Sequence, residues 1–263
     1  MELRVNGKTA YAYTGGKTFD PALPTVVFSH GAQCDHSVWI LQSRYLAHHG
    51  YGVLALDLPG HGRSEGPALA RIENLADWIA AALDAAGVKQ ASLVGHSMGS
   101  LVALECAARH PARLAKIALL ATAYPMKVSD QLLEATKNDE PAAQDMVNIW
   151  SHAAYAQYPN NPGPGFWVIG ENLRLMQRQK PGVMHVDFSA CNAYAGGAEA
   201  AAKVQCPALF LIARRDAMTP ARSAQAFAQS VKGARMVMIE GSGHNMMGEK
   251  PDEVLDTLVA FLK

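Results

Sequence analysis

Apolar and polar positions alternate between two patterns along the first half of the chain. Short, nearly continuous apolar runs, typical of parallel strands covered on both faces, predict strands at 25–29, 52–56, 91–94 and 115–120. Between these runs, apolar residues recur at helical spacing over 74–86 and over 101–109. Because strands separated by helices are joined by right-handed crossovers, this half predicts a doubly wound parallel sheet with helices on both faces. Residues 9–14 alternate less clearly and are consistent with an antiparallel edge strand.

The alternation of strands and helices stops at Tyr124-Pro125 and resumes only after Lys203. The residues between them are helical or irregular in pattern, rich in aromatic side chains, and include a loop by composition at 158–165. Beyond them, strands are predicted at 208–212 and 236–239, and helices at 220–231 and 252–262. We therefore expect one α/β core formed by residues 1–123 and 204–263, with residues 124–203 inserted into it.

Composition narrows the class of protein. Of the 263 residues, 49% are hydrophobic and 17% charged, which favours a sizeable buried core over intrinsic disorder. Lysine plus arginine and aspartate plus glutamate are equal at 23 each, so no basic excess indicates nucleic acid or an anionic membrane as a partner. The four cysteines form no CxxC pair, which disfavours a metal centre or a disulfide scaffold. No apolar stretch has the length of a membrane span, and the first residues lack a signal-peptide core, so we expect a cytoplasmic protein. No pattern indicates an oligomeric state.

A candidate nucleophile lies where the strand at 91–94 runs directly into a helix. The segment Gly95-His96-Ser97-Met98-Gly99 is a Gly-x-Ser-x-Gly pattern in a strand–turn–helix setting. Such a sharp turn puts Ser97 at the carboxyl end of the strand, and the two glycines let strand and helix approach. The first N–H groups of the helix then point at negative charge that develops beside the serine. The alternative is a glycine-rich turn whose serine only caps the helix.

A serine nucleophile needs a base, usually a histidine that a carboxylate orients. Of the ten histidines, His244 lies just past the last predicted strand, at the carboxyl edge of the sheet, where ligands bind in open α/β folds. Asp216 follows the strand at 208–212 and reaches the same edge, although taken alone it could be a turn or helix-capping aspartate. Ser97, Asp216 and His244 therefore form the expected catalytic set.

An oxyanion hole needs two preorganised N–H donors beside the nucleophile. The N–H of Met98, at the start of the helix, is the first expected donor. The second is expected from the segment Ser29-His30-Gly31-Ala32-Gln33, with Ala32 N–H preferred and Gln33 N–H as the alternative. His30 is interpreted as a buried residue that holds this loop by hydrogen bonds, not as a catalytic one.

Taken together, these residues resemble the α/β-hydrolase superfamily. The resemblance covers essentially the whole length and is carried by His30-Gly31, Asp57-Leu58-Pro59-Gly60-His61-Gly62-Arg63-Ser64, Gly95-His96-Ser97-Met98-Gly99 and Gly243-His244. It is greatest to small esterases, lactonases and cofactor-free haloperoxidase-like hydrolases. It implies an eight-stranded, mostly parallel sheet, with residues 124–203 as a helical cap. Haloalkane dehalogenases and epoxide hydrolases of this fold use an aspartate nucleophile, whereas this chain has Ser97.

The resulting hypothesis is a serine hydrolase of carboxylic esters that works through an acyl-enzyme. In it, Ser97 attacks the carbonyl, His244 takes the proton and Asp216 orients the imidazole. No metal or organic cofactor is expected, because the chain has no Gly-x-Gly-x-x-Gly or P-loop pattern. The aromatic residues and methionines of the insertion favour a small or medium, fairly apolar substrate. The candidate substrate contacts are Gln33, Met126, Trp150 and Trp167.

The sequence is compatible with two alternatives. The same three residues could act on lactones, on carbon–carbon bonds of diketones or in perhydrolysis, since fold and triad do not distinguish these reactions. The second alternative is a ligand-binding protein that kept the hydrolase fold and lost turnover.

Overall fold

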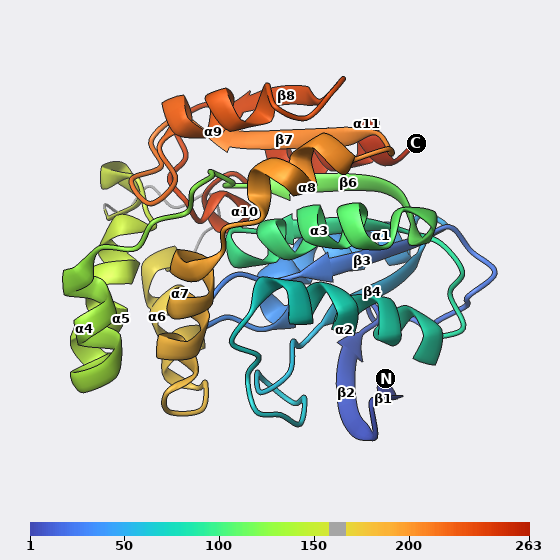
Figure 1. The fold of residues 1–263 in the computed structure, drawn as a ribbon, viewed down its shortest axis with the longest axis horizontal. Coiled ribbons are helices and arrows are strands. Elements are labelled where there is room, and N and C mark those ends of the chain that lie inside the picture. Colours follow the sequence, from blue (N-terminus) through green and yellow to red (C-terminus); the bar gives the residue numbers. More distant parts are fainter. Residues whose placement is uncertain (158–166) are drawn as a thin grey trace.

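The computed structural model describes residues 1–157 and 167–263, and these form one eight-stranded sheet with helices on both faces (Figure 1). The strand order is β1-β2-β4-β3-β5-β6-β7-β8. Neighbours from β4 to β8 in this order are parallel, whereas β2 pairs with β1 and with β4 in the antiparallel sense. This confirms the predicted fold class. The strands are β1 (Glu2–Val5), β2 (Lys8–Tyr13), β3 (Thr25–Ser29), β4 (Gly52–Leu56), β5 (Ala91–His96), β6 (Leu114–Leu120), β7 (Ala208–Ala213) and β8 (Arg235–Ile239).

The antiparallel edge begins with a hairpin that the apolar pattern does not single out. Strand β1 has only four residues and turns into β2 through Asn6 and Gly7, whose φ angles are 52° and 79°. Positive φ at both central residues is the geometry of a tight two-residue hairpin, and Asn-Gly is its favoured sequence. The Asn6-Gly7 pair is therefore the local signal for β1.

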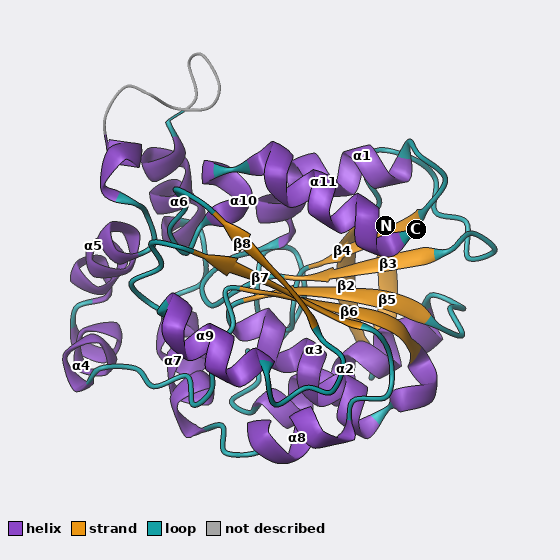
Figure 2. Ribbon diagram, turned by 90° about the horizontal axis from the view of Figure 1, so that it is seen from above, coloured by secondary structure: helices purple, strands orange, loops and turns teal. Residues whose placement is uncertain are grey.

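The continuous apolar runs arise because the central strands are covered on both faces (Figure 2). Leu93 and Val94 of β5 are adjacent in sequence, point to opposite faces and are both fully buried. Leu93 packs in the apolar cluster that includes residues of α2 and α3, and Val94 in the cluster that includes residues of α1 and α11. Each such side chain contributes roughly 1.5–3 kcal/mol by leaving water.

Two helical layers enclose the sheet. Helices α2, α3, α8 and α9 cover one face, and α1, α10 and α11 cover the other (Figure 2). In the described part of the chain, no helix is both long and apolar enough to cross a membrane. The bounds are α1 (Ile40–Ala47), α2 (Ile72–Ala85), α3 (Met98–Arg109), α8 (Gly197–Lys203), α9 (Ala221–Ala228), α10 (Met246–Glu249) and α11 (Pro251–Leu262), with short 3-10 turns η1 (His36–Trp39) and η2 (Pro111–Arg113).

Between β6 and β7, four helices of the described residues lie beyond the carboxyl ends of the strands (Figure 1). They are α4 (Asp130–Asn138), α5 (Glu140–Trp150), α6 (Val168–Gln177) and α7 (Val183–Ala193), with a 3-10 turn η3 (Ala154–Gln157) after α5. We call α4–α7 the helical insertion; it has its own apolar cluster, which includes Leu132, Met184 and Phe188. Helix α8 packs instead against α3, so the last helix of the inserted residues belongs with the core layer. The predicted loop at 158–165 lies outside the described residues.

Candidate active site

Ser97 is the single residue between β5 and α3, and its backbone is strained. Its φ is 52° and its ψ is −119°, a conformation that non-glycine residues rarely adopt. The turn requires glycine on both sides, because a Cβ on Gly95 would lie 2.1 Å from Gly99 O, and a Cβ on Gly99 would lie 2.4 Å from Ser29 O. The N–H of Ser97 donates to Leu120 O at 2.9 Å. The fold thus presents a serine hydroxyl at the carboxyl end of the central strand.

Asp216 and His244 follow the neighbouring parallel strands β7 and β8, and a hydrogen bond joins their buried side chains. His244 Nδ1 lies 2.8 Å from Asp216 Oδ2. Thr219 donates its hydroxyl to Asp216 Oδ2 at 2.6 Å and its N–H to Oδ1 at 2.7 Å. Because the ionised carboxylate only accepts, Nδ1 of His244 carries a proton, and in the neutral ring Nε2 has a free lone pair. Thr219 is a supporting residue that the sequence analysis missed; its signal is the Asp-x-x-Thr spacing, typical of a side chain that closes a turn.

The surroundings of the imidazole set the charges of its neighbours. Burial by itself raises the pKa of Asp216, but His244 and the hydrogen bonds from His244 and Thr219 outweigh it and lower the pKa below its ordinary value. The carboxylate is therefore charged at neutral pH. His96 Nε2 donates to His244 O at 2.9 Å, and burial together with His244 lowers the pKa of His96 to about 3. His96 is thus a neutral support for the His244 backbone.

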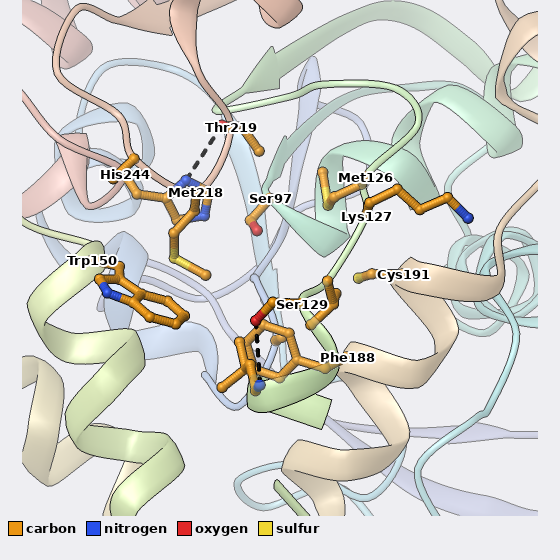
Figure 3. Close-up of a pocket in the computed structure, with 14 residues that line it drawn as sticks. Ser97, Met126, Lys127, Ser129, Trp150, Phe188, Cys191, Met218, Thr219 and His244 are labelled. Carbon is orange, nitrogen blue, oxygen red and sulfur yellow. Dashed lines mark hydrogen bonds between the residues drawn. The ribbon is translucent and has the colours of Figure 1, made fainter. Parts of the chain in front are cut away.

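Ser97 and His244 open into one cavity of about 330 Å³ (Figure 3). In the described part of the chain the side-chain hydrogen bonds of His244 go to Asp216 and Thr219, and none joins its ring to Ser97 Oγ. A hydrogen bond between a nucleophile and its base often tightens only when a substrate binds. Lys127 extends away from Ser97 in Figure 3, and its Nζ donates to Asn192 O, so the space beside the serine is largely apolar. The other lining residues are Ala32, Met126, Val128, Ser129, Leu132, Trp150, Phe188, Cys191, Ala217, Met218 and Thr219.

The loop after β3 borders the same cavity through Ala32. Among the described residues, neither Ala32 N–H nor Met98 N–H donates a hydrogen bond, whereas Gln33 N–H donates to Asp187 Oδ2 at 2.8 Å. This distribution favours Ala32 over Gln33 as the second donor. Met98 directly follows Ser97 at the start of α3, and Ala32 lines the same cavity as Ser97, so these two N–H groups stay the predicted donors of an oxyanion hole.

His30 holds the loop after β3 in place. Its Nδ1 donates to Gly31 O at 2.8 Å, and its Nε2 accepts Leu58 N–H at 3.1 Å. Burial and the nearby His61 lower the pKa of His30 to about 4, so the ring is neutral, as these two bonds require. The structure therefore gives His30 the supporting place that the sequence analysis assigned to it.

The four candidate substrate contacts fall into two groups. Met126 and Trp150 line the cavity. Gln33 and Trp167 are not among the lining residues: Gln33 is fully buried against the helical insertion, and Trp167 is 65% exposed at the start of α6, packed on Gly170. For Gln33 and Trp167 a substrate contact therefore stays a prediction, because the fold of the insertion, and not proximity in sequence, decides which side chains reach the cavity.

Glu249 joins the His244 loop to the segment that follows α5, a contact that no sequence pattern reveals. Its Oε1 accepts Gly243 N–H at 2.9 Å, and its Oε2 accepts Ala153 N–H at 3.0 Å. The carboxyl group is almost fully buried. The position of the backbone just before His244 therefore depends on this side chain.

The free energy of unfolding should depend on pH through Glu249. Burial raises the pKa of Glu249 to about 7, although its two backbone hydrogen bonds act in the opposite direction. Because the folded protein binds this proton more tightly than the unfolded chain, the stabilisation is complete below pH 4.5, the ordinary value, and is lost as the pH rises through 7. Urea denaturation measures this effect. As the pH rises from 4.5 to about 7, the free energy of unfolding of the native protein should fall relative to that of Glu249→Gln. The exposed Asp252→Asn serves as the control, and a difference that is independent of pH contradicts the assignment.

One cluster, Asp35, His36 and Asp57, has metal-ligating atoms close together in the described part of the chain. Its carboxylates are already engaged, since Arg178 donates to both oxygens of Asp35 at 2.9 and 2.7 Å, and Asp57 Oδ1 accepts the N–H of His36 at 2.8 Å. The donor set thus fits an ion pair that joins the loop after β3 to the end of α6.

Comparison with known proteins identifies the family of this fold. The model of the Alpha/beta hydrolase family matches residues 26–257. The chain belongs to this family. The alpha/beta hydrolase is 25% identical over 268 residues to an (E)-2-((N-methylformamido)methylene)succinate hydrolase of Acinetobacter baylyi, covering 98% of this chain and 95% of the relative.

Two further relatives of this alpha/beta hydrolase differ in the substrates that their names state. A pimeloyl-[acyl-carrier protein] methyl ester esterase of Neisseria meningitidis is 29% identical over 205 residues, covering 73% of this chain and 75% of the relative. The enol-lactonase of Burkholderia xenovorans LB400 superposes with a TM-score of 0.87 at 25% identity, covering 100% of this chain and 99% of that one. The family therefore supports hydrolysis, and the bond that is cleaved varies among its members.

Proposed function

We propose that this alpha/beta hydrolase cleaves carboxylic esters of small to medium, fairly apolar substrates. The observation that carries the proposal is that Ser97 and the Asp216-bound His244 open into the same apolar cavity. The methyl ester esterases among its relatives support this choice of bond. Lys127, a charged residue among the described lining residues, extends away from Ser97, which favours an uncharged group next to the scissile bond.

The proposed cycle is acyl transfer through a serine ester. Ser97 Oγ attacks the carbonyl carbon while Nε2 of His244 takes the hydroxyl proton, and Asp216 stabilises the imidazolium. The carbonyl oxygen gains the negative charge and accepts the N–H groups of Ala32 and Met98. The alcohol then leaves with the proton from His244. Water attacks the acyl group by the same route, and the acid is released as Ser97 regains its proton.

In this proposal the helical insertion acts as a cap over the cavity. Met126, Leu132, Trp150 and Phe188 line the cavity from the inserted residues, so they would contact the acyl or alcohol group of the substrate. Apolar walls with few polar groups bind by burying apolar surface and leave orientation to the oxyanion hole. The size of the acceptable acyl chain is therefore set by the insertion.

Lactone hydrolysis is the second candidate function. It is favoured by the similarity to an enol-lactonase over the whole length of both chains. The same Ser97 attack would open a lactone ring, with the leaving alcohol still attached to the acyl-enzyme.

A substrate panel tests the proposal. Native protein is assayed with nitrophenyl esters of acetate, butyrate, hexanoate, octanoate and dodecanoate, with simple lactones, and with β-diketones. Turnover of the short and medium esters, falling for dodecanoate, is expected, because the cavity of about 330 Å³ limits chain length. Each substrate is repeated with Ser97→Ala as the background.

The possible outcomes separate the candidate functions. Preference for lactones over every ester would replace the ester proposal by lactone hydrolysis. Turnover of diketones alone would exclude both. If no substrate is turned over and a fluorophosphonate probe fails to label Ser97, the binding-protein alternative is favoured instead.

A further inference from the structure

Gln33, which directly follows the expected oxyanion donor Ala32, is held by the helical insertion. Its N–H donates to Asp187 Oδ2 on α7 at 2.8 Å. Its side-chain Nε2 donates to Glu140 Oε1 at the start of α5, at 3.0 Å, and to Met176 O in α6, at 3.1 Å. Three of the inserted helices therefore converge on one buried residue of the core.

The backbone at Gln33 needs this support. Its φ is 56°, in the left-handed region that favours glycine. The two peptide groups that flank the Ala32 Cα are fixed from opposite sides. The carbonyl of Gly31 accepts His30 Nδ1 from the core, and the N–H of Gln33 donates to Asp187 from the insertion. The direction of Ala32 N–H is therefore determined jointly by the core and the insertion.

Asp187 is itself fixed by His61. Asp187 Oδ2 lies 2.8 Å from His61 Nε2, and each side chain is 1% exposed. The other ring nitrogen, Nδ1, lies 3.0 Å from Pro59 O, so both ring nitrogens face acceptors and the pair is ionic. Burial lowers the pKa of His61, but the charge and hydrogen bond of Asp187 and the bond to Pro59 raise it overall. A charged carboxylate is a stronger acceptor for Gln33 N–H than a neutral group.

We propose that Asp187 is a positioning residue that makes the oxyanion hole depend on the seated helical insertion. With α7 in place, Asp187 locks the peptide between Ala32 and Gln33, and Ala32 N–H points to the developing oxyanion. Movement of the insertion away from the core would break this bond, so the donor is preorganised only when the cavity is covered. The inference rests on the proposed function and extends it, because it assigns catalytic preorganisation to a side chain outside the cavity lining.

The test is Asp187→Ala on the best ester of the panel. We expect kcat to fall by about ten- to a hundredfold, part of the effect of losing an oxyanion donor, while KM changes by less than about twofold. Binding of an alkylboronic acid, whose tetrahedral adduct with Ser97 places an oxygen in the oxyanion hole, should weaken in parallel with kcat. Binding of the matching neutral alcohol as a competitor should be unchanged, since it uses only the apolar walls.

Three further variants separate positioning from folding. Asp187→Asn keeps an oxygen for Gln33 N–H and should restore kcat to within about threefold of native. Glu140→Ala removes one anchor of the Gln33 side chain at the half-buried start of α5 and should lower kcat and boronate binding several-fold together. Thr136→Val is the matched control. It removes a hydroxyl that donates to Leu133 O within α4 at 2.7 Å and lies 3.0 Å from His185 Nδ1 on α7, and neither contact reaches the core; native kinetics are expected.

Specific results overturn the inference. Suppose that the native protein turns over its ester and that Asp187→Ala has the same kcat and the same boronate affinity as the native protein. This result would exclude the positioning role of Asp187 and leave the proposed function intact. Equal losses of boronate and alcohol binding would reduce Asp187 to a general structural role. If Asp187→Ala does not fold, Glu140→Ala takes its place, and unchanged kcat and boronate binding in that variant would also exclude the positioning role. Absence of all turnover and of boronate binding by the native protein would overturn the proposed function first.

Discussion

Replacement of Ser97 by alanine should lower kcat by about a millionfold, the largest loss expected from any single change in this protein. The reason is that the acyl-enzyme route disappears, and only the oxyanion donors and the cavity remain to promote direct attack by water. The strained backbone at Ser97 is held by Gly95, Gly99 and the N–H bond to Leu120 O, so alanine should fit without loss of fold. The measurement is turnover of the best ester from the panel, with circular dichroism to check folding.

A fluorophosphonate probe gives the control for this variant. The probe should label native protein and not Ser97→Ala. Ser92→Ala, a serine at the amino-terminal end of the same strand and outside the cavity lining, should keep both turnover and labelling. Turnover by Ser97→Ala within a hundredfold of native, beyond any contaminating activity, would rule out serine catalysis.

Replacement of Asp216 by asparagine should lower kcat by about 10⁴-fold. An amide at this position can donate to His244 Nδ1, which moves the ring proton to Nε2 and removes the base from the side that faces the cavity. The backbone N–H groups of Met218 and Thr219 can still bind the amide oxygen in place of Asp216 Oδ1, so the loop should keep its shape. The loss is therefore a change of tautomer, not of fold.

The measurement is kcat for the same ester across neutral pH, beside the free energy of unfolding. The pKa of Asp216 is lowered in the folded protein. The charged carboxylate therefore stabilises the folded protein at every pH above the ordinary pKa of aspartate, and this stabilisation is lost only as the pH falls through the lowered pKa. The activity loss in Asp216→Asn should therefore persist throughout the neutral range. Asp252→Asn on α11, an exposed carboxylate, should behave as native. A loss of less than tenfold in Asp216→Asn would show that another group orients the imidazole.

Much of the core can be read from local pattern. Continuous apolar runs of strand length predict β3, β4, β5, β6 and β7, because both faces of these strands are buried. The run of apolar residues is by itself enough to indicate this burial. The sharp turn at Ser97 can also be predicted from local sequence, since its geometry depends on glycines two residues away on either side. Asp216 and His244 follow adjacent parallel strands, so their meeting at one edge follows from topology once the strand order is known.

Other features depend on how the inserted helices pack. Trp150 and Trp167 are both aromatic residues of the inserted segment, yet Trp150 lines the cavity and Trp167 is largely exposed. Helix α8 lies in the inserted residues but packs against α3 in the core. Helical periodicity specifies an apolar face without specifying its partner, so it cannot distinguish these outcomes.

The sequence by itself determined the sheet, its two helical layers and the position of the serine turn, because these depend on residue periods and on neighbours a few positions apart. Only the tertiary structure decided which N–H groups are free beside Ser97 and which side chains line the cavity. Gln33 and Asp187 are separated by 154 positions, and no local preference of either residue encodes their hydrogen bond. That contact exists because packing of α7 against the core brings a buried carboxylate to an N–H group that would otherwise be unpaired.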